Sequence, residues 1–203
     1  LVIGNPPYSS GQNSANDNNA NLKYPTLDKR IAETYAAKST AVNKNSLYDS
    51  YLRAFRWATD RIGDRGVVAF VSNGGWIDGN TADGIRLSMA EDFTDLYVFN
   101  LRGNMRNSNW RAEGGQVFGT GSQTTVAILV GVRNTRLGKF HLNYSQTPDR
   151  ATRSDKLDNL RSQSIKTIDW TIIEPNKQGD WLNKRSEDFA TWPVIGTKKD
   201  SPQ

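Results

Sequence analysis

The residues best suited to chemistry are Asn5-Pro6-Pro7-Tyr8, which directly follow a short apolar stretch, Leu1 to Gly4. An exocyclic amine on an aromatic ring is a weak nucleophile because its lone pair is delocalised into the ring. The side-chain carbonyl of Asn5 and the backbone carbonyl of Pro6 could each accept one amine hydrogen, since Pro7 restricts Pro6 to an extended conformation. Tyr8 adds a flat face on which a base can stack. The tetrapeptide therefore predicts methyl transfer to an amino nitrogen, with these four residues as the catalytic set.

The target of such a site would have to leave a nucleic-acid duplex to be reached. Flipping a nucleotide out costs a few kcal/mol, and stacking on an aromatic side chain returns about 1–3 kcal/mol of that. The alternative interpretation is an ordinary strand that ends in a proline-stiffened turn. That alternative explains Pro6 and Pro7 but not Asn5 and Tyr8 beside them.

The chain contains no cysteine. Methylation of cytosine at ring carbon 5 proceeds through a covalent cysteine adduct, so this composition favours direct transfer to an amino nitrogen. The same absence excludes disulfides and thiolate zinc sites, and it fits a reducing cytoplasm. The single histidine, His141, has no ligand-spaced partner, so we predict a structural role for it and no metal site. The longest apolar run, near Val126 to Val132, is too short to span a bilayer.

Positive charge is concentrated in one part of the sequence. The net charge is +5 over 203 residues. Between Arg133 and Lys166 there are eight basic residues and three aspartates, which gives 8 − 3 = +5, so the rest of the chain is neutral. Such a segment suits contacts with DNA phosphates, with Arg150, Arg153 and Lys156 as the candidates. An ordinary solvated face is the alternative.

Apolar patterns predict an α/β sheet. Continuous apolar runs predict buried strands at 66–72, 96–100 and 124–132, and helical spacing predicts helices near 26–35, 47–63 and 81–92. In such sheets ligands bind beyond the carboxyl ends of the strands, where Asn5, Asn73 and Arg102 all fall. The Gly119-Thr120-Gly121 run precedes a strand, so we interpret it as a turn and not as a dinucleotide fingerprint.

The chain divides into two expected parts. We expect residues 1–145 to form the catalytic half of a domain, with a flexible Asn-rich loop over 9–23, and residues 146–203 to form a basic extension. Because Leu1 is not an initiator methionine and begins directly on a strand, the sequence also has the character of a fragment.

Several segments resemble the methyltransferase part of type ISP restriction–modification enzymes, which join nuclease, helicase, methyltransferase and target-recognition domains in one chain. The resemblance covers nearly the whole sequence. Its segments, besides the Asn-Pro-Pro-Tyr motif, are Tyr24 to Ile31, Leu47 to Trp57, Val71 to Trp76, Asn100 to Asn104, Phe118 to Ser122 and Gly179 to Leu182.

The resemblance implies a Rossmann-like methyltransferase sheet, incomplete because only its catalytic half is present. It implies transfer of a methyl group from S-adenosylmethionine to the 6-amino group of an adenine flipped out of double-stranded DNA. Tyr8, Phe118 and Asn73 would contact the base. The cofactor-binding loop and acidic residue of the family would lie upstream of Leu1. The target-recognition domain would lie downstream, and only the approach to it, from about Trp170 onward, would be present.

Two other hypotheses stay open at this point. Enzymes that methylate glutamine side chains of release factors, or bases of ribosomal RNA, also use Asn-Pro-Pro-Tyr. A non-enzymatic remnant that binds nucleic acid is the third possibility.

Overall fold

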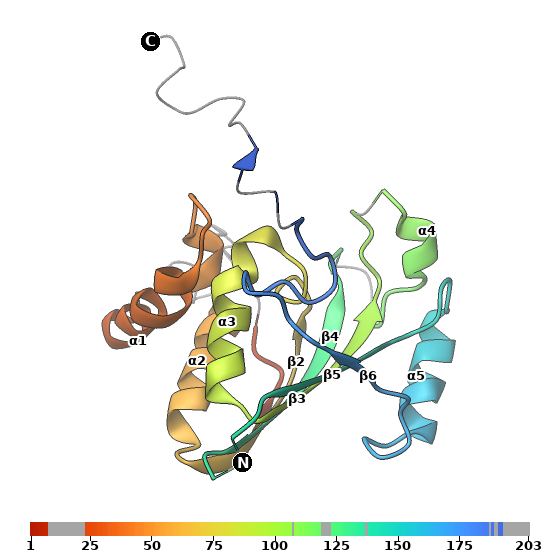
Figure 1. Ribbon diagram of the computed structural model, residues 1–203. Helices are drawn as coiled ribbons and strands as arrows, with labels where there is room; N and C mark the ends of the chain where they lie inside the picture. Colours follow the sequence, from red (N-terminus) through yellow and green to blue (C-terminus); the bar gives the residue numbers. More distant parts are fainter. Residues whose placement is uncertain are drawn as a thin grey trace.

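The computed structural model describes residues 1–7, 23–106, 108–118, 123–136, 138–186, 188 and 191–192. One six-stranded sheet organises them, in the spatial order β1-β2-β4-β3-β5-β6 (Figure 1). The strands are β1 (Val2–Gly4), β2 (Arg65–Asn73), β3 (Asp95–Arg102), β4 (Val126–Asn134), β5 (His141–Gln146) and β6 (Thr171–Ile173). The predicted mixed α/β class is confirmed, and the three predicted strands correspond to β2, β3 and β4.

Strand direction decides which residues meet at one edge of the sheet. β1 runs parallel to β2, and β3 runs parallel to β5. β4 is inserted between β2 and β3 and is antiparallel to both, whereas β6 is antiparallel to β5. The four strands β1, β2, β3 and β5 therefore share one direction, and their carboxyl ends lie along a single edge.

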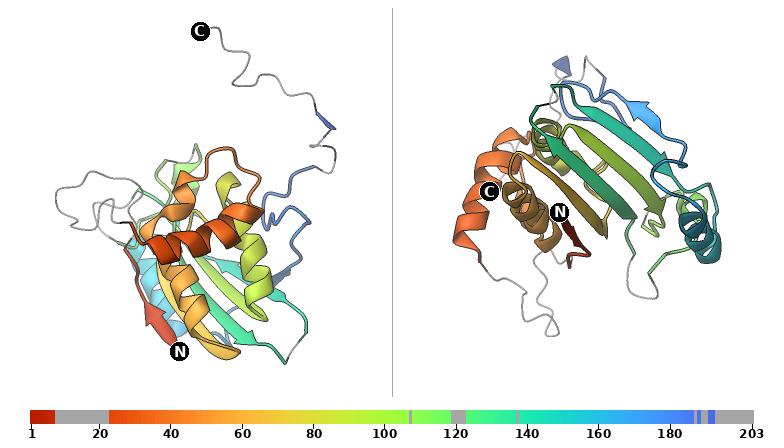
Figure 2. Two further views of the ribbon diagram at one scale, coloured as in Figure 1. Left: turned by 90° about the vertical axis from the view of Figure 1, so that its left-hand side faces the viewer. Right: turned by 90° about the horizontal axis from the view of Figure 1, so that it is seen from below.

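Three helices cover one face of the sheet (Figures 1 and 2). They are α1 (Pro25–Ile31), α2 (Ser50–Arg61) and α3 (Asp83–Asp92), accompanied by a π-helical turn η1 (Ala32–Ala36) and two 3₁₀ turns, η2 (Asn45–Tyr48) and η3 (Asn80–Ala82). Phe55 of α2 stacks on Phe70 of β2 at 5.6 Å between ring centroids and meets Trp76 edge-on at 5.6 Å. Burial of these apolar rings fixes α2 against the sheet.

The opposite face of the sheet is covered by the short helix α5 (Arg153–Ser162) and by Trp170. Alternate residues of β3 divide between the two faces, as strand geometry requires. Leu96 and Val98 join the core under α1–α3, whereas Phe99 and Leu101 pack in a smaller cluster with Leu157 and Leu160 of α5.

Beyond the expected boundary at residue 145/146, the described residues continue the same sheet and core. β6 pairs with β5, with Thr171 opposite Tyr144. Trp181 is 2% exposed and packs edge-on against Trp76 at 5.7 Å. Residues 146–182 therefore pack as part of the same sheet and core as the residues before them.

Candidate functional site

The polar residues predicted at strand ends do lie at one edge of the sheet. β1 ends at Gly4, which is paired with Phe70, and β2 continues three residues further to Asn73. Asn5 and Asn73 therefore follow neighbouring strands. Arg102 ends β3, which is separated from β1 by β2 and β4. Three strand spacings of about 4.8 Å place Arg102 about 14 Å along the edge from Asn5.

The Asn-Pro-Pro segment leaves the sheet at this edge. Asn5 and Pro7 are exposed, whereas Pro6 is buried. The buried ring of Pro6 anchors the turn while the side chain of Asn5 stays accessible to a ligand. Tyr8 and the predicted flexible loop, except for Lys23, lie outside the described residues, so the stacking role of Tyr8 and the flexibility of the loop stay predictions.

Asn73 shapes the turn that follows β2. Its side-chain oxygen accepts a hydrogen bond from the backbone N–H of Gly75 at 2.7 Å, and its amide donates to Thr124 Oγ1 at 3.2 Å. The first bond closes the turn after β2, and the second joins that turn to the entrance of β4. These hydrogen bonds give Asn73 a structural function at the wall of the site, and its contact with a base stays a prediction.

A second polar turn follows β3. Arg102 has a positive φ of 57°, and Gly103 a φ of 92°. The carboxylate of Glu113, from α4 (Trp110–Glu113), accepts hydrogen bonds from the backbone N–H groups of Gly103 at 3.1 Å and Asn104 at 3.2 Å. Arg102 also pairs with Glu113 and with Asp149. Residue Glu113 therefore fastens the loop after α4 to the end of β3.

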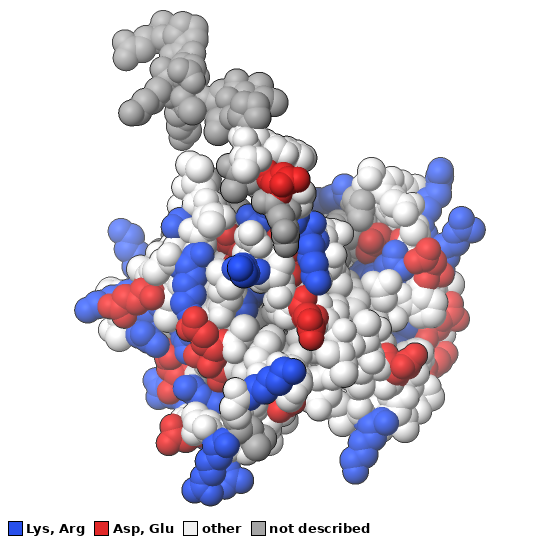
Figure 3. Space-filling model, in the orientation of Figure 1, with Lys and Arg blue, Asp and Glu red and all other residues white. Residues whose placement is uncertain are grey.

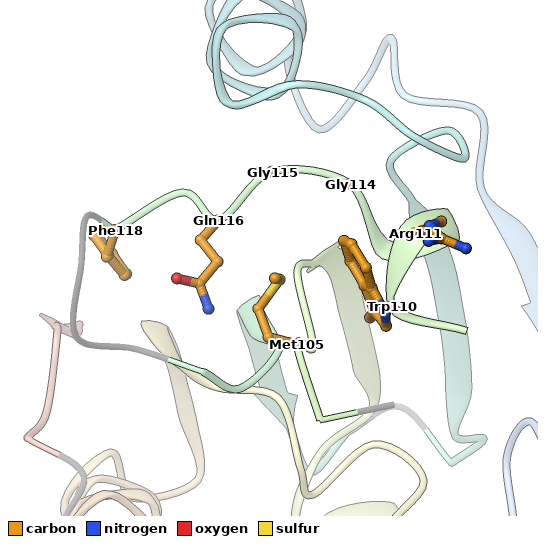
Figure 4. Close-up of a pocket in the computed structure, with 7 residues that line it drawn as sticks. All are labelled: Met105, Trp110, Arg111, Gly114, Gly115, Gln116 and Phe118. Atoms are coloured by element: carbon orange, nitrogen blue, oxygen red, sulfur yellow. The ribbon is translucent and has the colours of Figure 1, made fainter. Parts of the chain in front are cut away.

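A pocket of about 480 Å³ opens beside this turn. Figure 4 shows Met105 and Gln116 converging on it from opposite sides, with Trp110 at one end and Phe118 at the other. Met105 is 43% and Trp110 44% exposed. An apolar, aromatic pocket of this size suits a flat ring such as a nucleobase. Phe118 was predicted to contact the base, whereas Met105 and Trp110 were not predicted. Their signal in the sequence is that two large apolar residues stand in an otherwise polar loop.

The three predicted phosphate contacts have different environments. Arg150 and Arg153 are exposed, but Arg153 Nε donates to the backbone oxygen of Val117 at 2.8 Å. Lys156 is 0% exposed, and its ammonium donates to the backbone oxygens of Glu113 at 2.9 Å and Gly115 at 2.7 Å. The prediction that Lys156 contacts DNA phosphates is therefore wrong: its charge is turned inward. On the face drawn in Figure 3, basic and acidic side chains are interspersed.

Burial sets the pKa of Lys156. Removal from water lowers this pKa to about 8, although the nearby charge of Glu113 opposes the shift; the charge of Arg102 adds to it. In β5, burial raises the pKa of the Tyr144 hydroxyl, although the hydrogen bond that Asn100 donates to it acts to lower this pKa.

Other predicted features concern metals, membranes and His141. Among the described residues, no three His, Asp or Glu side chains form a group that could hold a metal ion. None of the helices in the described part of the chain has the length and apolar character that a bilayer crossing needs. His141 Nδ1 lies 3.2 Å from Asp95 Oδ1, away from the strand-end site.

The fold and this edge define a class: a mixed α/β domain with a polar Asn-Pro-Pro turn and an aromatic pocket beyond the carboxyl ends of its strands. No family model and no curated protein matches the chain. Solved structures do. A nuclease-deletion mutant of the type ISP restriction–modification enzyme LlaGI, in complex with a DNA substrate mimic, matches at 43% identity and a TM-score of 0.89 over 98% of this chain.

Two further structures agree. The ATP-dependent type ISP restriction–modification enzyme LlaBIII bound to DNA matches at 37% identity and a TM-score of 0.89, over 98% of this chain. DrdV in complex with DNA matches at 39% identity and a TM-score of 0.83, over 92%. The chain belongs to the type ISP restriction–modification family. It spans 19%, 14% and 18% of the LlaGI, LlaBIII and DrdV chains, respectively.

Proposed function

We propose that this chain is the base-binding part of a DNA adenine methyltransferase within a restriction–modification protein. The observation that carries the proposal is the exposed Asn5 on a buried Pro6 at the carboxyl end of β1, in a chain of the type ISP family. We propose that the sheet is the catalytic half of a Rossmann-like methyltransferase domain. The parent protein would bind double-stranded DNA, as LlaGI, LlaBIII and DrdV do in their complexes, and would act in the cytoplasm.

The proposed mechanism uses two acceptors on one turn. The side-chain carbonyl of Asn5 and the backbone carbonyl of Pro6 accept the two hydrogens of the adenine 6-amino group. These hydrogen bonds draw the nitrogen toward a tetrahedral shape and localise its lone pair for attack on the methyl carbon. Pro7 keeps Pro6 extended, so that its carbonyl is preset. Stacking on Tyr8 and Phe118 offsets the cost of flipping the nucleotide.

The methyl donor in this proposal is S-adenosylmethionine, which supplies an electrophilic methyl group when bound. The pocket of Figure 4 does not fit it as a holder, because its lining has no carboxylate to take the ribose hydroxyls; the lining residues are Met105, Trp110, Arg111, Gly114, Gly115, Gln116 and Phe118. The resemblance places the donor's main loop upstream of the Asn-Pro-Pro-Tyr strand. We therefore assign the residues of this chain to the base and not to the donor.

Asn5→Ala in the complete natural protein tests the proposal. Transfer of tritium from labelled S-adenosylmethionine to plasmid DNA should fall by about a hundredfold or more, since both the acceptor and its alignment are lost. Asn134→Ala is the matched control, because Asn134 ends β4 at the opposite edge of the sheet; its rate should stay within about twofold. Undiminished DNA methylation by Asn5→Ala would refute the proposal, and label found in RNA or protein would favour the other substrate classes.

A further inference from the structure

The loop that carries Phe118 is held in place from the start of α5. This loop, residues 113–118, runs from the end of α4 toward β4 along the pocket of Figure 4. Lys156 donates to the backbone oxygens of Glu113 and Gly115, and Arg153 donates to that of Val117. Gly115 N–H donates to the backbone oxygen of Ala151 at 2.9 Å. Four hydrogen bonds thus join three residues of the loop to three residues in or just before the first turn of α5.

Two glycines let the backbones approach this closely. A Cβ atom on Gly114 would lie 2.3 Å from the backbone oxygen of Ala151, and Gly114 has a φ of 72°. A Cβ atom on Gly115 would lie 2.7 Å from the backbone nitrogen of Arg153. Any larger residue at either position would push the loop away from α5. The spacing of loop and helix is therefore set by backbone contact as well as by the two side chains.

The first turn of α5, which forms the helix side of this contact, is fixed by an N-terminal cap. Thr152 and Asp155 form a reciprocal capping box at the start of α5, in which the Thr152 hydroxyl accepts from Asp155 N–H at 3.2 Å and the Asp155 carboxylate accepts from Thr152 N–H at 2.8 Å. The box fixes the first turn, from which Arg153 and Lys156 project toward the loop. The far side of the loop is tied to the end of β3 by Glu113 and by Gln116, whose amide lies 3.5 Å from the Gly103 oxygen.

We propose that Lys156 and Arg153 are positioning residues that hold the 113–118 loop, and with it Phe118, in the geometry that receives the flipped base. This inference rests on the proposed function. In this arrangement the first turn of α5, although it lies in the basic segment of the sequence, supports the 113–118 loop and does not contact the DNA backbone. Because a buried ammonium is costly to desolvate, a lysine at this place is explained by its two charge-assisted hydrogen bonds to backbone oxygens.

Methylation kinetics and DNA binding of three variants test the inference in the complete natural protein. Lys156→Met keeps the length of the side chain and removes both donors. Arg153→Met removes the one donor to the Val117 oxygen, at an exposed position, so it reports even where Lys156→Met does not fold. Lys29→Met, at a 76% exposed lysine of α1, is the control for loss of a charge. The measured quantities are kcat, the KM for DNA, the KM for S-adenosylmethionine, and the dependence of DNA affinity on salt.

We expect Lys156→Met and Arg153→Met to lower kcat by about tenfold to a hundredfold, as a misplaced loop near the reacting group does. The KM for S-adenosylmethionine should change by less than about twofold, and the slope of log affinity against log salt should stay that of the wild type. A slope smaller by about 1 would overturn the inference, because each lost phosphate contact has that effect. An unchanged kcat in both variants, with Asn5→Ala inactive, would overturn the inference and leave the proposed function standing. An active Asn5→Ala would refute the proposed function itself.

Discussion

Arg86 gives the sharpest test of how the wall of the site is supported. It lies in α3 and its side chain is 2% exposed. Its guanidinium donates to the backbone oxygens of Gly179 at 2.5 Å, Trp76 at 3.1 Å and Gly79 at 3.0 Å, and lies 3.5 Å from the Asp180 carboxylate. One side chain therefore joins the turn after β2, which begins at Asn73, to the segment that follows β6.

Replacement of Arg86 by Met removes all of these interactions at about constant volume. A buried acceptor left without a partner costs about 1–3 kcal/mol, and removal of one partner of a buried ion pair costs about 3–5 kcal/mol. Asp180 keeps its hydrogen bonds from Arg185, at 2.8 and 3.0 Å, which limits the second cost. Because three buried backbone oxygens lose their donor and the ion-pair cost is reduced, we expect Arg86→Met to lower the free energy of unfolding by about 3–5 kcal/mol in total.

Urea unfolding of the chain measures this loss as a lower midpoint at an unchanged slope. Arg61→Met, at an exposed arginine that ends α2 and lies 4.9 Å from the centre of the Trp57 ring, should cost no more than about 1 kcal/mol. Asp180→Asn should destabilise the Arg86→Met background by less than it destabilises the wild type, because the two residues interact. A loss below about 1 kcal/mol for Arg86→Met, or strict additivity with Asp180→Asn, would refute the reasoning.

Three further predictions concern pH and backbone contact. Burial alone would raise the pKa of Asp180, but hydrogen bonds from Arg185 and Asn176 hold this pKa at about 2, below its ordinary value. The contribution of Asp180 to stability should therefore be present above pH 4 and be lost as pH falls toward 2. Thermal unfolding of Asp180→Asn should lack this acid dependence, and equal dependence on pH in both proteins would contradict the prediction. Burial lowers the pKa of Lys156 to about 8, so the folded state binds fewer protons than the unfolded state between about pH 8 and 10.5, and stability should rise with pH across that window in the wild type but not in Lys156→Met. Gly114→Ala should destabilise the chain by about 1–3 kcal/mol in urea, because a Cβ atom meets the Ala151 oxygen and φ is positive; a substitution without cost would show that the loop is not held against α5.

The sequence predicted the strands that lie in apolar runs and failed where pairing is non-local. Strands 66–72, 96–100 and 124–132 match β2, β3 and β4 within a few residues because their apolar residues are continuous. β5 was missed because only Leu142 and Tyr144 of its six residues are buried and apolar. The insertion of β4 between β2 and β3 has no local signal either, since a strand's neighbours depend on the whole sheet.

The site was predicted only in part, because only some of its residues have a local signal in the sequence. Asn5 and Asn73 carry a readable signal, because they directly follow strands that share a direction. Lys156 carries no such signal, because a lysine in a polar helix can direct its charge either to phosphates or to the carbonyl oxygens of a loop. Only the close approach at Gly114 and Gly115 turns it inward, and that approach depends on a contact across 41 residues of chain.

The most direct test of the central claim is the identity of the methylated product. The complete natural protein is incubated with DNA and isotope-labelled S-adenosylmethionine, and the nucleosides of the digested DNA are separated by mass spectrometry. The account predicts labelled N6-methyl-deoxyadenosine from the wild type and from Asn134→Ala, and none from Asn5→Ala. Label on another base, on RNA or on protein, or equal labelling of adenine by Asn5→Ala, would contradict it.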